Sequence, residues 1–362
     1  MTKRDKTFLI YGANGYTGRL ITHLAVKEGL KPILAGRNEK AIKEMAKKYD
    51  LPYEVVDLTN KEALNDAVLL ANVVLHCAGP FSRTYKPMLE ACIKNGTHYL
   101  DITGEIEIFE KVAARDSRIK NAGIMAMPGT GFDVVPTDCL AAYLKSQLPT
   151  ATHLELAFSG TGGISHGTAT TMLENLGRGG AIRKDGVITK VPNAYKVKPI
   201  TYGKRPIMSA TIPWGDVSTA YHSTGIRNIE VYTAMNKWML RMMQSKGLSK
   251  WFLHSSFMKN MMQKIVDRRS PGPNAAQRSK GKSLVWGKAY DEKGNVVAAR
   301  ITTLEGYTLT ALTALEITKR VLNDDYCIGF QTPSSAYGAD FILEIKGTKR
   351  EDIVQKREIN VQ

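Results

Sequence analysis

Several features that would point to a function directly are absent from this 362-residue sequence. Its four cysteines (Cys77, Cys92, Cys139 and Cys327) are scattered without metal-ligand spacing, which suits free thiols in a reducing compartment. No HExxH pattern and no cluster of metal ligands occurs, so a metalloenzyme gets no support. Repeats and low-complexity tracts are absent as well, and the composition is that of a folded protein.

Long apolar segments and acidic residues are also scarce. No predominantly apolar segment reaches the roughly 18 residues of a membrane-spanning helix, and the apolar run near the N-terminus is too short for a signal peptide. Asp and Glu number 34 against 50 Lys and Arg, a formal net charge of +16. This excess favours an anionic partner such as a phosphorylated cofactor or a lipid surface. The basic residues are spread out and no recognition motif appears, so we expect no nucleic acid partner.

The first 130 residues alternate between strand-like and helix-like segments. Strands are expected at 7–11, 32–35, 53–56, 73–76, 98–101 and 124–127, and helices at 16–28, 40–48, 61–70, 85–94 and 106–121. Strands separated by helices indicate a parallel sheet with helices on both faces. The expected fold class is therefore α/β, with a Rossmann dinucleotide-binding domain over residues 1–130.

The pattern changes after residue 130. A helix at 133–145, with Asp133 as its expected cap, precedes strand-like segments at 154–159, 187–191, 207–212 and 229–234. A hairpin is expected across 284–291 and 296–303, and a helix at 308–322. We therefore expect a second, mixed α+β substrate domain over 131–305, with a sheet more antiparallel than parallel. Residues 306–362 form a C-terminal segment.

A glycine-rich turn, GANGYTG, follows the first expected strand. Gly12 permits a tight turn with positive φ, Gly15 lets the backbone close on a diphosphate, and Gly18 lets the helix sit close to the strand. Free N–H groups and the helix dipole would attract the anion. A plain structural turn is the alternative, but a strand before and a helix after favour dinucleotide binding. The remaining residues expected to contact the cofactor here are Asn14, Tyr16 and Thr17.

The end of the second strand, LAGRN, indicates which dinucleotide binds. An acidic residue there would bind a ribose 2′-hydroxyl and select NAD. Arg37 stands there instead, followed by Asn38, and a guanidinium suits a 2′-phosphate. NADP(H) is therefore the expected cofactor; Arg37 as an ordinary surface residue is the alternative. Asp57, after the third strand, either contacts the adenine or caps the next helix. The residues expected beside the nicotinamide half follow the fourth strand: Ala78, Gly79, Pro80 and Phe81.

The combined pattern resembles the saccharopine dehydrogenase-like oxidoreductases, in particular the branch that includes the trans-acting enoyl reductases. The resemblance rests on GANGYTGRL, LAGRN, HCAGPFSRTYKPMLEACIKNGTHYLDITGE and GTGFDVVPTD, and on the later WGDVSTAYHSTGIRNIEVY, EGYTLTALTALEI and GFQTPSSAYGADFIL. It implies an NADP-type Rossmann domain, an α/β substrate domain and a C-terminal segment that returns to the first domain. It also implies an NAD(P)-dependent oxidoreductase with a small-molecule substrate.

Hydride transfer requires the protein to position the substrate and to supply a proton. Tyr85 follows the fourth strand beside Lys86, whose charge would lower its pKa; packing at the helix entrance is the alternative. Asp101, in YLDITGE, is placed to reach a ribose, the substrate or a neighbouring helix terminus. His222 and His166 lie in polar, glycine-containing surroundings, where each is either a proton donor or structural.

Residues 235–269 form a methionine-rich basic stretch. It holds seven of the 14 methionines, together with Trp238 and Trp251 and interspersed Lys and Arg. Two short helices fit, each with an apolar and a basic face. Such helices suit peripheral contact with an anionic membrane, a lid over an apolar pocket, a homodimer interface or packing on their own domain.

The leading hypothesis is an NADP-dependent oxidoreductase acting on a C=O, C=N or conjugated C=C bond of a small, apolar or lipid-like substrate. The alternative is a dinucleotide-binding, membrane-associated interaction protein without turnover. The expected location is cytoplasmic, either free or peripheral at a membrane.

Overall fold

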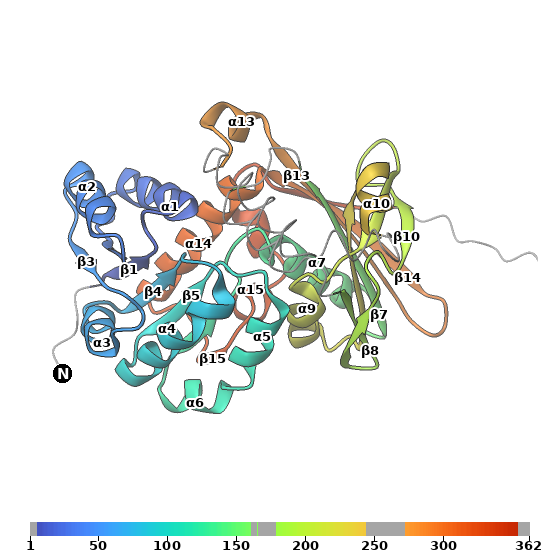
Figure 1. Ribbon diagram of the computed structural model, residues 1–362. Coiled ribbons are helices and arrows are strands. Elements are labelled where there is room, and N and C mark those ends of the chain that lie inside the picture. The colour runs from blue at the N-terminus through green and yellow to red at the C-terminus, as the bar shows by residue number, and fades with distance from the viewer. Residues whose placement is uncertain (1–5, 161–164, 166–178, 244–271, 354–362) are drawn as a thin grey trace, which may run out of the picture.

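A computed structural model describes residues 6–160, 165, 179–243 and 272–353, and two sheets organise them (Figure 1). The first is parallel, in the order β15-β6-β5-β4-β1-β2-β3. Strand order reverses between β1 and β4, and ligands of such sheets bind outside the carboxyl ends of the strands at this point. The predicted Rossmann sheet is confirmed. Its strands are β1 (Phe8–Tyr11), β2 (Ile33–Gly36), β3 (Tyr53–Val55), β4 (Val73–His76), β5 (His98–Asp101), β6 (Met125–Met127) and β15 (Gly329–Phe330).

Helices cover both faces of this sheet, as the apolar strands require. Strand residues point alternately to the two sides: Ile10 joins one core cluster and Leu9 the other. The first cluster is closed by α1 (Tyr16–Lys27), α2 (Glu39–Tyr49) and α14 (Gly306–Leu322). The second is closed by α3 (Lys61–Leu69), α4 (Phe81–Asn95), α5 (Ile106–Ala113) and α6 (Asp116–Asn121).

Two helix predictions need correction. The single helix expected at 106–121 is two helices that meet at Arg115, where the backbone takes φ −99° and ψ 7° and the N–H donates to Val112 O, three residues back, at 2.9 Å. The helix expected from residue 133 is α7 (Val135–Gln147), whose N-cap is Val134 without a side-chain bond. Asp133 is therefore not a cap, and its carboxyl is free for another role.

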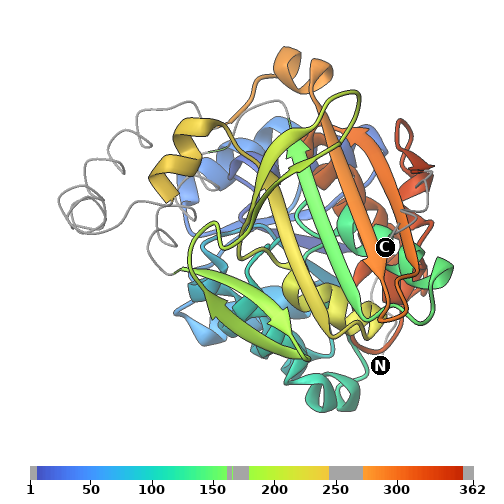
Figure 2. The same ribbon diagram turned by 90° about the vertical axis from the view of Figure 1, so that its right-hand side faces the viewer.

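The second sheet is mixed, in the order β10-β11-β12-β7-β13-β14-β16, with β8 and β9 attached through β12. Figure 2 looks onto this sheet, whose strands lie in front of the helices. β7 and β12 pair in parallel and the other neighbours pair antiparallel, which confirms the predicted mixed domain and hairpin. Its strands are β7 (His153–Gly160), β8 (Gly180–Lys184), β9 (Val187–Val191), β10 (Val197–Ile200), β11 (Ile207–Thr211), β12 (Asn228–Ala234), β13 (Lys282–Tyr290), β14 (Val296–Leu304) and β16 (Lys349–Asp352).

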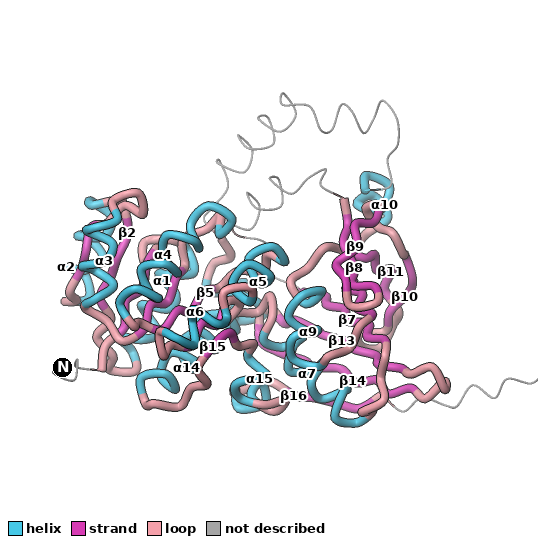
Figure 3. The backbone as a smooth tube through the Cα atoms, turned by 90° about the horizontal axis from the view of Figure 1, so that it is seen from below, coloured by secondary structure: helices cyan, strands magenta, loops and turns pink. Residues whose placement is uncertain are grey.

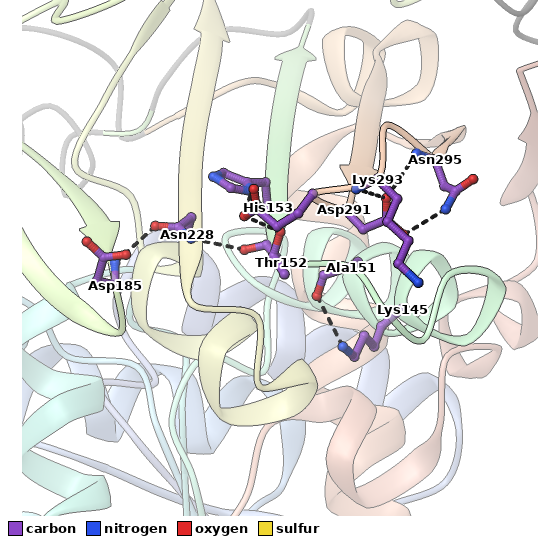
Figure 4. Close-up of polar contacts among 10 residues, drawn as sticks. Lys145, Ala151, Thr152, His153, Asp185, Asn228, Asp291, Lys293 and Asn295 are labelled. Carbon is purple, nitrogen blue, oxygen red and sulfur yellow. Dashed lines mark hydrogen bonds and ion pairs between the residues drawn. The ribbon is translucent and has the colours of Figure 1, made fainter.

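Asp291 fixes the turn of the β13–β14 hairpin (Figure 4). Its Oδ1 accepts from the backbone N–H groups of Lys293 and Asn295 at 3.0 and 2.9 Å, and its Oδ2 accepts from Thr150 Oγ1 at 2.7 Å. The side-chain amide of Asn295, which donates to Oδ2 at 2.9 Å, and then Thr150 and the backbone donors lower the pKa of Asp291 to about 2. Gly294 takes φ +81°, which only glycine adopts freely. The hairpin register follows from this turn.

The C-terminal part of the described chain touches both sheets. α14 packs against α1, and β15 pairs in parallel with β6 of the first sheet. After α15 (Pro333–Tyr337) and a 3-10 turn (Phe341–Glu344), β16 pairs antiparallel with β14 of the second sheet. Remaining helices are α9 (Asp216–Thr224), α10 (Lys237–Met243) and α13 (Ala275–Lys280). The domain boundaries given above stay predictions.

Candidate functional site

The glycine turn is shaped by close backbone contacts. Gly12 takes φ +82°, and a Cβ on it would lie 2.8 Å from the Ala78 backbone N. A Cβ on Gly18 would lie 2.3 Å from Gly12 O, closer than any real contact, so α1 reaches the turn only because this residue is glycine. Gly15 N donates to Gly12 O at 3.0 Å and closes the turn. The positive φ of Gly12 and the close approach at Gly18 are as predicted, whereas the diphosphate contact predicted at Gly15 stays a prediction.

The N-terminus of α1 is electrostatically open to an anion. Its N-cap is Gly15, which has no side chain, and no acidic residue lies in the first turn. The first-turn N–H groups therefore have no helical acceptor. At α4 the situation is reversed, because Glu105 Oε1 accepts from Phe81 N at 3.0 Å. Compared with that of α4, the N-terminus of α1 is therefore the more favourable place for an anion.

The carboxyl ends of β1, β2 and β3 bring Arg37 and Asp57 together. Arg37 is exposed directly after β2 and forms no hydrogen bond or ion pair with any described residue. Asp57 Oδ1 accepts from Thr59 N and Oγ1 at 2.9 and 2.7 Å, which lowers the pKa of its carboxyl. The N-cap of α3 is Asn60, so Asp57 does not cap the next helix, and its contact with the adenine stays a prediction. Asn38 Oδ1 caps α2 by accepting from Ala41 N at 3.0 Å. Of the three predicted side chains, Arg37 alone stays fully available to a ligand.

The loop after β4 lies against the glycine turn. Ala78 contacts Gly12 directly, and its carbonyl accepts from Thr84 Oγ1 at 2.7 Å. The Gly79–Pro80 peptide is cis and leads into α4, with the Phe81 ring against buried His76 at 5.3 Å. The structure thus brings this loop and the glycine turn together at the strand-order reversal. This is where the sequence placed the nicotinamide half.

Asp101 is buried and holds the loop after β6 against the end of β5. It is fully buried; its Oδ1 accepts from Thr103 N and Gly129 N at 2.9 and 3.0 Å, and its Oδ2 accepts from Tyr99 OH at 2.6 Å. Burial raises the pKa of Asp101 to about 6, although these donors oppose the shift. Both carboxyl oxygens are engaged in joining β5 to the loop after β6.

Tyr85 and His222 both have partners outside the glycine turn. Tyr85 is 4% exposed and packs in the core cluster between α4 and α5, which favours its packing alternative. His222 lies in the last turn of α9, with Nε2 at 3.6 Å from Glu110 Oε1. Glu110 also accepts from buried Arg183 at 2.6 Å and thereby ties α5 to β8. His166 lies outside the described residues.

Asp133 is the ionisable group that the sequence reasoning missed as a site residue. Its carboxyl lies against Gly104, where a Cβ would sit 2.7 Å from Oδ2, at the carboxyl edge of β5. Burial raises the pKa of Asp133 to about 7, with no described group bonding its carboxyl oxygens. Trp214 Nε1 donates to Asp133 O at 2.9 Å and so fixes the backbone.

An aromatic wall adjoins this carboxyl. The ring of Phe158 lies 4.8 Å from Trp214 and 5.9 Å from Phe132, the residue before Asp133. Asp216, at the start of α9, is fully buried and its pKa is raised well above the usual range by burial and by the neighbouring acids. Burial raises the pKa of Asp133 itself to about 7, close to neutral pH. The wall and the acid suit an apolar substrate that accepts a proton.

These residues fit a pyridine dinucleotide. The glycine turn leaves space that any Cβ would fill, α1 offers unpaired N–H groups, and Arg37 offers a free guanidinium where the adenine ribose of such a ligand lies. Ala78 follows β4, and the Asp133 carboxyl lies against Gly104, which follows the neighbouring strand β5. Among the described residues no group of three or more His, Cys, Asp or Glu could hold a metal ion.

Comparisons with known proteins agree with this geometry. The family of the saccharopine dehydrogenase NADP binding domain matches residues 8–127. A solved structure of apo saccharopine dehydrogenase (L-Glu forming) from Saccharomyces cerevisiae superposes with a TM-score of 0.65 over 97% of this chain and 100% of that chain. Its sequence identity is 14%, so this likeness shows the fold alone.

The curated relatives match only part of this chain. Saccharopine dehydrogenase-like oxidoreductase of Mus musculus is 26% identical over 50% of this chain and 48% of its own length. A lipid droplet localized protein of Caenorhabditis elegans is 28% identical over 55% and 52%. A trans-acting enoyl reductase of Mycobacterium leprae is 33% identical over 38% and 34%. The chain thus spans about half the length, or less, of the curated relatives it matches. Residues 8–127 thus match the NADP binding domain of saccharopine dehydrogenase, and the chain as a whole is similar to the saccharopine dehydrogenase-like oxidoreductases and to the related trans-acting enoyl reductases.

Proposed function

We propose that this protein is an NADP(H)-dependent oxidoreductase that acts on a C=O, C=N or conjugated C=C bond of a small, apolar or lipid-like substrate. The observation that carries the proposal is the bare N-terminus of α1 beside the unpaired guanidinium of Arg37. The N-terminus of α1 suits a diphosphate, and the guanidinium of Arg37 suits a 2′-phosphate. The aromatic wall of Phe132, Phe158 and Trp214 supports an apolar substrate.

Bound nicotinamide supplies hydride chemistry at the carboxyl edge of the first sheet. The chain itself must hold the substrate and provide the proton. Asp133 is the group placed to do so, because it is near half-protonated at pH 7 and has no partner among the described residues. A pKa close to the working pH is what general acid catalysis favours.

Replacing Arg37 with Ala should weaken NADPH binding by roughly 10- to 100-fold and leave NADH binding within about twofold, since charge-assisted bonds to the 2′-phosphate are lost. Isothermal titration calorimetry with both cofactors measures this. Lys40→Ala, an exposed residue of the next helix, is the matched control. Equal losses for NADPH and NADH would remove the 2′-phosphate assignment, and no binding of either cofactor to the wild-type protein would remove the proposed function.

A second candidate function is a membrane-associated dinucleotide-binding protein without turnover. α10 lies beside β11 at the edge of the second sheet (Figure 3). Met235, two residues before α10, donates its N–H to Met208 O of β11 at 2.9 Å. Trp238 is 67% exposed and Met208 40%. Exposed Lys237 and Arg241 flank them, a composition that suits an anionic lipid surface. The rest of the methionine-rich stretch, 244–269, lies outside the described residues.

The relative named as lipid droplet localized gives this candidate further support. No helix among the described residues is long and apolar enough to cross a membrane, so contact here would be peripheral. A cytoplasmic location and a homodimer remain predictions, the latter to be tested by the molar mass in solution.

Flotation with vesicles containing phosphatidylserine should recover the wild-type protein at low salt. Trp238→Ala should reduce the floated fraction about tenfold, because the indole no longer enters the interface. Ile328→Ala, at a residue that is 48% exposed beside β15, should change nothing. Absence of flotation by the wild-type protein, or equal flotation of both variants, would rule out lipid contact through α10. NADPH consumption with a panel of substrates separates this candidate from an enzyme.

A further inference from the structure

The chain that follows residue 271 lies on the cofactor turn itself. Tyr16 OH donates to Pro273 O at 2.6 Å, Arg278 Nη1 donates to the same carbonyl at 2.7 Å, and Arg278 Nη1 lies 3.0 Å from Tyr16 OH. Tyr16 is the first residue of α1, directly after Gly15, whereas Arg278 belongs to α13 and leads into the second sheet. We call Tyr16, Pro273 and Arg278 the clasp.

The fit around the Tyr16 ring shows that the contact is close and specific. A Cβ on Gly272 would lie 2.7 Å from the ring, so the backbone approaches it only because this residue is glycine. On another side the Tyr307 ring stands at 5.0 Å and 88° to that of Tyr16. Tyr307 is the second residue of α14. Three separate parts of the chain therefore meet at the first residue of the phosphate-binding helix.

Within the clasp, the positive charge of Arg278 has no described carboxylate as a partner. Arg278 bonds through Nη1 alone, and no described carboxylate pairs with its guanidinium. The acid that acts on Tyr16 is Glu305, whose Oε2 already accepts from the N–H groups of Tyr307 and Thr308 at the start of α14. The end of α1 beside the clasp carries the positive pole of the helix dipole. A guanidinium beside that pole repels it unless an anion lies between them.

We propose that Arg278 is a phosphate ligand that the second sheet domain contributes to the diphosphate of the dinucleotide, so that the cofactor is held from both sides. This inference rests on the proposed NADP(H) function. Nε and Nη2 of Arg278 offer donors in a planar fork that suits phosphate oxygens, while Nη1 stays on Pro273 O. Arg278 recognises the part that NADPH and NADH share, whereas Arg37 recognises the part in which they differ.

Calorimetry with NADPH, NADH and adenosine 2′-monophosphate tests whether Arg278 binds the diphosphate and Arg37 the 2′-phosphate. The third ligand carries the 2′-phosphate but no diphosphate. Arg278→Ala should weaken both dinucleotides by roughly 10- to 100-fold and leave adenosine 2′-monophosphate within about twofold. Arg37→Ala should weaken NADPH and adenosine 2′-monophosphate and spare NADH. The affinity of Arg278→Ala for NADPH should also depend less on salt than that of the wild-type protein.

Three further variants separate ligation from shaping of the turn. Arg278→Lys keeps a charge and should recover part of the lost affinity, and Tyr16→Phe keeps the guanidinium and should lose less than Arg278→Ala. Lys280→Ala, an exposed residue of the same helix, should bind as the wild-type protein does. Unchanged dinucleotide affinity in Arg278→Ala, or an equal loss for all three ligands, would overturn the inference and leave the proposed function standing. A wild-type protein that binds neither dinucleotide would overturn both.

Discussion

Asp133→Asn is expected to lower kcat by roughly 10²- to 10⁴-fold for a substrate that the wild-type protein reduces, because an amide cannot give up a proton at this position. Asparagine keeps the size of the side chain and leaves the backbone carbonyl to accept from Trp214 Nε1. NADPH affinity should therefore stay within about twofold of the wild type. Steady-state rates of NADPH oxidation and calorimetric titration of the cofactor measure the two quantities.

The pH dependence provides an independent check. Burial raises the pKa of Asp133 to about 7, so the carboxyl is protonated below pH 7 and ionised above it. The rate of reduction should be level below pH 7 and fall about tenfold per pH unit above it, and this limb should vanish in Asp133→Asn. A variant with wild-type rates and an unchanged pH profile would exclude Asp133 as the proton donor.

Gly18→Ala should abolish measurable dinucleotide binding, a loss of more than about 100-fold, and destabilise the protein by about 1–3 kcal/mol. The new Cβ would lie 2.3 Å from Gly12 O and 2.8 Å from Ala13 Cα, and both are backbone atoms that cannot rotate away. Either α1 must move off β1 or the turn closed by Gly15 must open. Thermal unfolding and cofactor titration report the two effects.

Gly203→Ala is the matched control, because a Cβ there would meet nothing within 4 Å and its φ is not in the left-handed region. It should unfold and bind as the wild-type protein does. If Gly18→Ala bound NADPH with wild-type affinity, the turn would not be the diphosphate site.

The first sheet was predictable because its rules are local. Strands buried on both faces are short, apolar and separated by amphipathic helices, and a glycine turn is visible in the sequence at once. The second domain was less predictable. β8, β10 and β16 are only four or five residues long, too short to show a clear alternation of apolar and polar residues. β16 takes its place by pairing with β14, which is distant in sequence, whereas β8 and β10 pair with the strands that follow them.

The candidate site divides in the same way. Arg37 and the glycines could be placed because position along a βα unit determines their role. The catalytic roles of Asp101 and Tyr85 stay predictions, since the sequence gives their place after a strand but not the donors or the core that surround them. Asp133 and Arg278 could not be identified, because each acquires its surroundings from chain that is distant in sequence.

The last described strands set how the two halves can move. β15 is an edge strand of the first sheet and β16 an edge strand of the second, yet only 18 residues separate Phe330 from Lys349. This connecting segment is short and packs against α7, so it restrains a hinge motion that would separate the first sheet from the second. A dinucleotide is therefore expected to enter the crevice through a local movement of the clasp at the start of α1. The connection between β15 and β16 is expected to keep its contacts.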